Sequence, residues 1–326
     1  MIIVSVIMSV YNEPLEWLNI SIHSILNQSY QDFELIAVVD NPENHEAVNF
    51  LSDLKRTDKR LHLILNEQNI GLTKSLNKAL KVAKGKYIAR MDADDISHPL
   101  RLEKQIAYME QHEDIDILNT YATLFGENIS SKLKTAPIEH EAIAEILPYQ
   151  CVIVHPAVMI RCASFKIAYD ESFRRSQDYE LWLRLLYDGA RFHTLPESLL
   201  EYRISQTQIS TKNIGQQLKD NFRARKKILD SIFCDYGYKG LTVLSLSQIK
   251  ELFKKMQSVK YESLERTAIF HTYYSLPHHF WNFFRIPYDA FQYDFSIKQT
   301  TCIMLSYFTH RWDNYHIKNF PENYHV

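Results

Sequence analysis

Strand-like and helix-like segments alternate from Val4 to Met91, and this alternation limits the fold more than any other feature of the sequence. A continuous apolar run such as Val4–Val10 is typical of a strand that is buried on both faces of a parallel sheet. Strands are expected at residues 4–10, 33–39, 61–65 and 86–91, and helices at residues 15–26, 47–54 and 73–83. This order predicts an α/β fold with an open, twisted sheet and right-handed crossovers.

The pattern continues less regularly beyond Pro99. A helix is expected directly after Pro99, and residues 115–125 are expected to form a strand. Residues 151–161 are also read as a strand, interrupted by His155-Pro156. Another helix is predicted to open at Asp178.

The balance of charge changes near residue 211. Asp and Glu outnumber Lys and Arg before that point, whereas Lys and Arg dominate from Lys212 onward, and the last stretch is rich in aromatic residues. We therefore predict a first domain of residues 1–214 and a helical, basic and aromatic-rich region of residues 215–326. This region is either a membrane-surface element that faces anionic lipid or a subdomain that packs on the first domain or on a second subunit.

Polar residues follow the ends of the predicted strands. Tyr11-Asn12-Glu13 follows the first strand, Asp40-Asn41 the second, and Asp92-Ala93-Asp94-Asp95 the fourth, while Asn69-Ile70-Gly71 comes shortly after the third. Because ligands of open α/β sheets bind beyond the carboxyl ends of the strands, these segments define the candidate site.

The acidic segment Asp92-Ala93-Asp94-Asp95 is the strongest local signal. Carboxylates crowded at the end of a buried strand repel one another unless a cation lies among them. Hard oxygen ligands suit Mg²⁺ or Mn²⁺, whose remaining ligands come from substrate phosphates and water. The alternative is an acidic turn that caps the helix after Pro99.

Several classes of protein are excluded by composition. Glycine is scarce at 7 residues, and neither a Gly-x-Gly fingerprint nor a P-loop is present. The net charge of -2 provides no field that would attract nucleic acid, so no nucleic-acid partner is expected. The four cysteines form no Cys-x-x-Cys pair, which favours reduced thiols over a disulfide framework or a zinc site.

The sequence begins with a strand-like run, without a basic leader or a small-residue cleavage site. No stretch approaches the ~20 apolar residues that are needed to span a bilayer. We expect a cytoplasmic protein that is soluble or peripheral at the inner face of the plasma membrane.

The order of these motifs resembles the inverting family 2 glycosyltransferases of GT-A fold, and specifically the bacterial members that build lipopolysaccharide, O-antigen or capsule. The resemblance covers about residues 3–210. Further stretches typical of that group follow in order, namely Gly71-Leu72-Thr73-Lys74-Ser75-Leu76-Asn77, His155-Pro156-Ala157-Val158-Met159-Ile160-Arg161, Gln177-Asp178-Tyr179-Glu180-Leu181-Trp182 and Tyr202-Arg203-Ile204. A doubly wound mixed sheet with a C-terminal helical extension is therefore expected.

The resemblance assigns roles to residues of the nucleotide-sugar site. Tyr11 is similar to the ring that stacks on uracil, and Asp40 to the carboxylate that accepts a hydrogen bond from the uracil N–H. Glu13, Asn69 and Gly71 correspond to loops that shape the nucleoside pocket.

The resemblance also implies the metal and diphosphate contacts. Asp92 and Asp94 match the Asp-x-Asp motif, in which Asp94 corresponds to the direct ligand of Mn²⁺ or Mg²⁺ and Asp92 to a ribose or metal contact. Lys74 is similar to a diphosphate contact, although a lysine in the first turn of a helix can equally be solvated.

Asp178 resembles the family's catalytic base, which takes the proton from the acceptor hydroxyl. Gln177 stands where the family has Glu, so the surroundings of the base differ while the base is kept. A single displacement inverts the anomeric centre and predicts a β-linked product from a UDP-α-sugar. Without the family context, Asp178 could equally be the N-cap of its helix.

The metal site departs from the family pattern at one position. Relatives often carry His after the Tyr-Arg-Ile stretch, where this chain has Ser205, a weaker ligand. The metal is therefore expected to be held chiefly by Asp94 and the diphosphate, with His155 or His193 as substitute ligands.

Together these features predict transfer of a hexose or N-acetylhexosamine from a UDP-sugar to a glycan or lipid-linked saccharide acceptor. The alternatives are a sugar-1-phosphate nucleotidyltransferase and a non-catalytic nucleotide-sugar-binding module of the same fold. The first would need a Gly-rich cationic loop after the first strand, which Val10-Tyr11-Asn12-Glu13-Pro14 does not offer. The motifs identify neither the donor sugar nor the acceptor.

Overall fold

The computed structural model describes residues 2–127, 129–148, 150–163, 167–205 and 214–235. Contacts divide the chain into one unit of residues 1–144 and 151–221 and another of residues 145–150 and 222–326. The first unit carries the sheet and is described first. The proposed domain boundary at residue 214 stays a prediction.

The first unit contains a mixed nine-stranded sheet in the order β3-β2-β1-β4-β8-β6-β9-β5, with β7 paired to β6. Its strands are β1 (Val4–Val10), β2 (Phe33–Val39), β3 (Leu61–Leu65), β4 (Tyr87–Arg90), β5 (Ile96–Ser97), β6 (Ile117–Gly126), β7 (Lys132–Lys134), β8 (Met159–Arg161) and β9 (Phe192–Ile204). The first four strands are parallel, and β8 pairs antiparallel to both β4 and β6.

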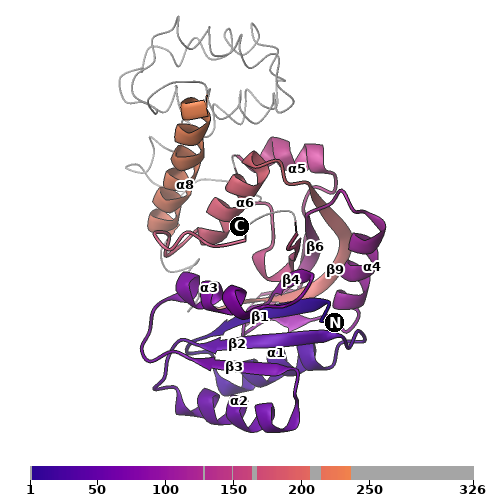
Figure 1. The fold of residues 1–326 in the computed structure, drawn as a ribbon, viewed down its shortest axis with the longest axis vertical. Helices are drawn as coiled ribbons and strands as arrows, with labels where there is room; N and C mark the ends of the chain where they lie inside the picture. Colours follow the sequence, from indigo (N-terminus) through magenta and orange to yellow (C-terminus); the bar gives the residue numbers. More distant parts are fainter. Residues whose placement is uncertain (1, 128, 149, 164–166, 206–213, 236–326) are drawn as a thin grey trace, which may run out of the picture. The chain divides into compact units, whose positions relative to one another are not determined.

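Helices cover both faces of this sheet (Figure 1). The helical elements within the described residues are α1 (Leu15–Leu26), α2 (His45–Thr57), α3 (Leu72–Val82), α4 (Arg101–Gln111), α5 (His140–Ile146), the 3₁₀ turn η1 (His155–Ala157), α6 (Gln177–Tyr187) and, mostly in the second unit, α8 (Ile214–Asp235). Helix α3 lies on the face opposite to α1 and α2 (Figure 1). The predicted α/β fold with a doubly wound mixed sheet is confirmed.

A buried hydrophobic cluster lies on the α1 face of the sheet. Alternate residues of β1, from Val4 to Val10, pack there with Leu18 and Ile22 of α1 and Leu51 of α2. Since successive side chains of a strand point to opposite faces, the remaining residues of β1 and β4 face α3. Arg90 belongs to this second face, together with Ile88.

One prediction about the irregular half of the sheet needs correction, and two elements were missed. Residues 151–161 do not form one strand, because Pro156 lacks the N–H that a ladder requires and lies instead in the η1 turn, which begins at His155. Only Met159–Arg161 is extended in a sheet. The long strand β9 and helix α5 were not predicted.

Gly85 allows the connection between α3 and β4 to approach β1 closely. The Gly85 N–H donates to Ser5 Oγ at 2.8 Å, and the Lys84 N–H donates to Glu34 Oε1 at 2.9 Å. A Cβ at position 85 would lie 2.5 Å from the Ser5 backbone N and 2.8 Å from the Tyr87 backbone O. Backbone atoms cannot yield as a flexible side chain does.

Replacing Gly85 by Ala is therefore expected to lower the free energy of unfolding by about 1–3 kcal/mol, the usual cost of overpacking. Thermal unfolding followed by circular dichroism measures this effect. Lys81→Ala, on the exposed face of α3, is the control and should melt as the wild type does. An unchanged melting temperature for Gly85→Ala would contradict the close approach.

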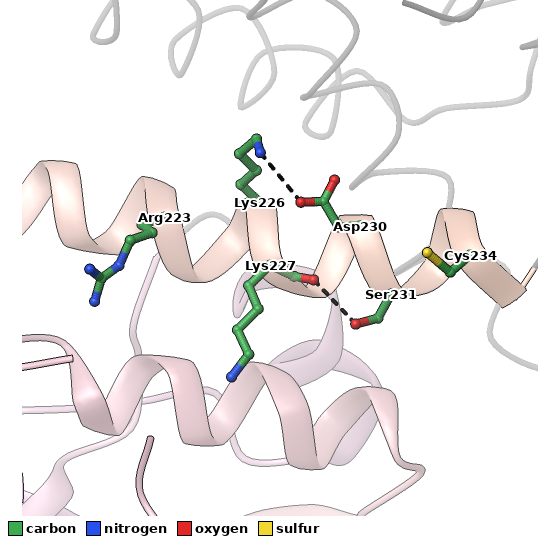
Figure 2. Close-up of a pocket in the computed structure, with 6 residues that line it drawn as sticks. All are labelled: Arg223, Lys226, Lys227, Asp230, Ser231 and Cys234. Carbon is green, nitrogen blue, oxygen red and sulfur yellow. Dashed lines mark hydrogen bonds and ion pairs between the residues drawn. The ribbon is translucent and has the colours of Figure 1, made fainter. Parts of the chain in front are cut away.

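Helix α8 carries a surface hollow lined by Arg223, Lys226, Lys227, Asp230, Ser231 and Cys234 (Figure 2). Lys226 Nζ lies 3.4 Å from Asp230 Oδ2, and Ser231 Oγ donates to the Lys227 carbonyl at 3.2 Å. Both are ordinary contacts between residues four apart on a helix. Helix α8 lies where the sequence was expected to become helical, and residues 236–326 lie outside the described ranges, so the character of the region 215–326 stays a prediction.

Among the helices within the described ranges, none combines the length and apolar character that crossing a bilayer requires. The predicted membrane-surface role falls mainly on residues beyond 235. It therefore stays a prediction.

Candidate active site

The polar segments that follow β1, β2 and β4 meet at one edge of the sheet. These strands are parallel neighbours, with β1 between β2 and β4, so their carboxyl ends lie side by side. Tyr11, Asp40 and Asp92 follow directly after, or one residue beyond, these ends. The structure thus assembles the segments that the sequence analysis assigned to one site.

Asp40 anchors the loop that precedes α3. Its Oδ1 accepts hydrogen bonds from Asn66 Nδ2 at 2.8 Å and from the Ile70 N–H at 2.9 Å. Its Oδ2 accepts one from the Gly71 N–H at 2.9 Å. Only 3% of Asp40 is exposed. The carboxylate therefore holds the 69–71 loop in place and keeps acceptor capacity for a ligand donor.

Gly71 turns the chain from this loop into α3. Its φ of +90° lies in the left-handed region that L side chains rarely adopt, although nothing would lie within 4 Å of an added Cβ. The glycine is therefore required by backbone conformation and not by lack of space. Asn69 supports the same turn, because its Oδ1 accepts a hydrogen bond from the Gly71 N–H at 3.0 Å.

Tyr11 is an exposed member of the predicted nucleoside contacts, with 43% of its surface accessible. Its backbone is fixed at both ends: the N–H donates to Glu13 Oε2 at 2.7 Å, and the carbonyl accepts from Asn44 Nδ2 at 3.0 Å. An accessible ring on a fixed backbone can stack on a flat ligand at low entropic cost. The geometry therefore suits the predicted stacking role.

Glu13 connects the end of β1 to the acidic segment. Burial raises the pKa of Glu13 to about 7, opposed by the N–H of Tyr11, and the negative charges of Asp94 and Asp92 add to the rise. The part of the rise that comes from Asp94 and Asp92 requires those charges to be near Glu13. Glu13 therefore lies beside the acidic cluster.

The acidic cluster consists of Asp92, Asp94 and Asp95, whose carboxylate oxygens come within 4.8 Å of one another. Asp95 is fully buried, and its Oδ2 has no hydrogen-bond partner. Burial, followed by the charges of Asp92 and Asp94, raises the pKa of Asp95 well above its ordinary value. A buried, unpartnered oxygen among three carboxylates fits a hard divalent cation.

Arg90, at the end of β4, was missed by the sequence analysis. Its guanidinium is 3% exposed and forms an ion pair with Asp92, while its Nε and Nη1 have no partner. Even a paired buried charge gains little stability, because the cost of desolvation offsets the attraction, so Arg90 is a candidate for a functional role. The signal was visible as an arginine inside an otherwise apolar strand.

Asp178 lies in the first turn of α6 and is half-buried. Burial raises its pKa, while the N–H groups of Tyr179 and Asp178 and the guanidinium of Arg90 oppose the rise. The charge of Asp92 also acts on Asp178. The predicted base therefore lies close enough to Arg90 and Asp92 for their charges to act on it.

The backbone that presents Asp178 is strained. Ser176 adopts a left-handed conformation with φ of +54°, alone among the described residues other than glycine. Such conformations persist where the surrounding structure imposes them, and they cluster at functional sites. Ser176 makes no side-chain cap for α6. Its strain thus gives Asp178 and Gln177 their positions at the start of the helix.

The remaining predicted contacts lie apart from the acidic cluster. His155 Nε2 pairs with the Tyr169 hydroxyl at 2.7 Å, and burial, aided by Arg90, lowers the pKa of His155 well below its ordinary value. His193 stacks on Tyr108 with ring centroids 4.7 Å apart. Neither histidine joins the group of potential metal ligands in the described part of the chain. Lys74 is exposed in the first turn of α3.

The site and the sheet define the class of this protein. Residues 5–167 match the family described as Glycosyl transferase family 2. The chain therefore belongs to glycosyl transferase family 2, as its motifs had indicated.

Individual relatives agree with this assignment. The chain is 38% identical to an uncharacterized glycosyltransferase of Methanocaldococcus jannaschii over 241 residues, which cover 71% of this chain and 83% of that protein. It is 39% identical to the O-antigen biosynthesis glycosyltransferase WbnJ of Escherichia coli over 214 residues, or 62% of this chain and 79% of WbnJ.

The fold is shared with a solved glycosyltransferase structure. TarS 1-349 of S. aureus in complex with UDP-GlcNAc superposes with a TM-score of 0.61 at 17% identity, covering 94% of this chain and 92% of that chain. The predicted GT-A fold is confirmed by this likeness. At 17% identity, the comparison shows that the fold is shared and nothing further.

Proposed function

We propose that this protein transfers a hexose or N-acetylhexosamine from a UDP-sugar to a glycan or lipid-linked saccharide acceptor. The observation that carries the proposal is the buried, unpartnered Asp95 Oδ2 within three carboxylates, directly beyond the central strand β4. The 69–71 loop, which Asp40 anchors, lies at the same edge of the sheet and would form part of the nucleoside pocket. The name of the relative WbnJ favours an acceptor in bacterial surface polysaccharide synthesis.

The donor nucleotide would bind at the ends of β1 and β2. The exposed Tyr11 ring offers a stacking surface for uracil, and Asp40 retains acceptor capacity for its N–H. Glu13, Asn69 and Gly71 fix the backbone around this pocket. Lys74 would contact the diphosphate. The UDP-GlcNAc bound to TarS supports a UDP-sugar as donor.

The carboxylates of Asp94 and Asp92, with Asp95 beside them, would hold Mn²⁺ or Mg²⁺. When bound, the divalent ion would offset the negative charge that develops on the leaving diphosphate. Arg90 supports the same site from within the sheet, because its ion pair fixes one oxygen of Asp92.

Asp178 would take the proton from the attacking acceptor hydroxyl. The carboxylate is held at its helix start by backbone N–H groups, and Arg90 favours its ionised form. One displacement without a covalent intermediate inverts the anomeric centre. A UDP-α-sugar would therefore give a β-linked product.

A panel of UDP-sugars tests this function. Purified protein with Mn²⁺ is incubated with UDP-glucose, UDP-galactose and the two UDP-N-acetylhexosamines, and released UDP is quantified with and without EDTA. We expect release from a subset of donors, loss of release in EDTA, and a β-linkage by NMR once an acceptor is found. A pure binding module would release no UDP, and an α-linkage would contradict the single displacement.

The location of the protein remains a proposal as well. We infer a cytoplasmic enzyme, peripheral at the inner face of the plasma membrane, because a lipid-linked acceptor would be presented there. Fractionation of cells that express a tagged chain would test this location.

A further inference from the structure

Arg203, near the end of β9, holds two consecutive residues of the acidic cluster. Its backbone N–H donates to Asp95 Oδ1 at 2.8 Å, and its side-chain Nε donates to the Asp94 carbonyl at 2.8 Å. These contacts join positions that are more than 100 residues apart in the sequence. Arg203 thereby fixes the backbone of one carboxylate residue and the side chain of the next.

The guanidinium of Arg203 is itself held between two aromatic rings. It lies 4.4 Å from the ring centroid of Trp17 and 4.4 Å from that of Phe125. Trp17 belongs to α1 and Phe125 to β6, so the two rings are carried by different elements of the first unit. Each of these cation–π contacts favours one position of the Arg203 guanidinium. The Nε donor is therefore presented from a fixed place.

The segment that Arg203 holds has little support of its own. Residues 92–95 lie between β4 and β5 in neither a helix nor a strand. Three carboxylates with oxygens within 4.8 Å repel one another, and this repulsion drives the side chains apart. Bonds from other elements must therefore impose the arrangement, and Ser21 Oγ contributes one more by donating to the Asp92 carbonyl at 2.9 Å.

We propose that Arg203 is a positioning residue for the divalent cation. It holds Asp94 and Asp95 in one arrangement before the divalent cation binds. Less conformational entropy is then lost on binding, and the cation binds more tightly. Arg203 acts through these two residues and needs no contact with the substrate. The inference rests on the proposed metal-dependent function.

The test measures Mn²⁺ affinity directly. Arg203→Lys keeps the positive charge but loses the planar Nε donor, while the backbone bond to Asp95 remains. Free Mn²⁺ is followed by electron paramagnetic resonance during titration of the protein with UDP present. We expect roughly tenfold weaker Mn²⁺ binding, the effect of losing one charge-assisted hydrogen bond.

Two further variants sharpen the test. Phe125→Leu removes one of the two rings without touching the hydrogen bonds, and a smaller loss of Mn²⁺ affinity is expected. Arg60→Lys is the matched control, because Arg60 also lies over a ring, 4.7 Å from the Phe33 centroid, and pairs with Asp58 before β3. Its Mn²⁺ affinity should equal that of the wild type. Phe125→Leu also keeps the test decisive if Arg203→Lys fails to fold.

Rescue separates positioning from simple loss of structure. With Arg203→Lys, UDP release should rise toward the wild-type rate as Mn²⁺ is raised to saturation. A lower melting temperature with unchanged Mn²⁺ affinity would mean a merely structural role and would overturn the inference. If the wild type itself shows no binding of Mn²⁺ with UDP, the proposed function fails and this inference fails with it.

Discussion

Replacing Asp178 by Asn is expected to slow sugar transfer by about 10²- to 10⁴-fold, the usual contribution of a general base. Asn has the same shape and can still accept the backbone N–H bonds that hold Asp178, but it cannot take a proton. Initial rates of transfer to an acceptor measure the effect, and calorimetry with UDP and Mn²⁺ should show unchanged binding.

Asp188→Asn supplies the matched control on the same helix. Asp188 is the C-cap residue of α6 and is exposed, so the same substitution there should leave the rate as in the wild type. The structure already corrects the N-cap alternative, because the N-cap of α6 is Ser176 and Asp178 lies in the first turn. Retained transfer in Asp178→Asn would therefore remove Asp178 from catalysis and leave it only a structural role at the start of α6.

The pH dependence of the wild type should report the same group. Burial raises the pKa of Asp178, so its carboxylate takes up a proton at a higher pH than an exposed Asp does. The base is therefore lost as the pH falls through this raised pKa, and the rate should decline on the acidic side. Glu13, whose pKa is raised to about 7, could produce a similar decline in rate. If Asp178 is the source of the decline, the same decline should therefore be measured in Glu13→Gln.

Replacing Asp94 by Asn is expected to abolish metal-assisted UDP binding and to lower transfer by at least about 10²- to 10³-fold. One carboxylate ligand of the proposed cation is lost, and the charge on the leaving diphosphate is then no longer offset. Isothermal calorimetry of UDP with and without Mn²⁺ is the measurement.

Stability should move in the opposite direction to activity. Without metal, the charges of Asp92 and Asp94 both raise the pKa of buried Asp95, which shows that the three groups repel one another. Removing one charge relieves this repulsion, so metal-free Asp94→Asn should melt at or above the wild-type temperature. Asp53→Asn, at an exposed ion pair with Arg56, serves as a control for charge loss. Mn²⁺-assisted UDP binding at wild-type strength in Asp94→Asn would refute the assignment.

The first half of the fold follows from local sequence patterns. The expected strands Val4–Val10, Phe33–Val39 and Leu61–Leu65 have the observed bounds. The first two are buried parallel strands, which are continuous apolar runs, whereas Leu61–Leu65 is an edge strand with only Leu61 buried. The strand β9 was missed for the opposite reason. It contains Pro196 and several exposed residues, and its pairing with β6 shifts register, so no regular alternation marks it.

The candidate site was only partly readable from the sequence. Polar residues at strand ends could be assigned to one edge because parallel strands end together. The contacts that hold these polar residues could not be predicted from the sequence. Asp40 contacts the 69–71 loop, and Arg203 contacts Asp94, only because the tertiary fold brings them together. Arg90 was overlooked because a strand pattern alone does not show whether an arginine is buried. The metal, the donor and the catalytic roles remain predictions.

The way Asp40 anchors its loop has a practical consequence for enzyme engineering. The Asp40 carboxylate accepts hydrogen bonds from the main-chain N–H groups of Ile70 and Gly71. Every residue except proline has such an N–H group. The side chain at position 70 is therefore not part of the anchor. A library that randomises this one position, proline excluded, should yield folded variants in which the 69–71 loop keeps its backbone anchor.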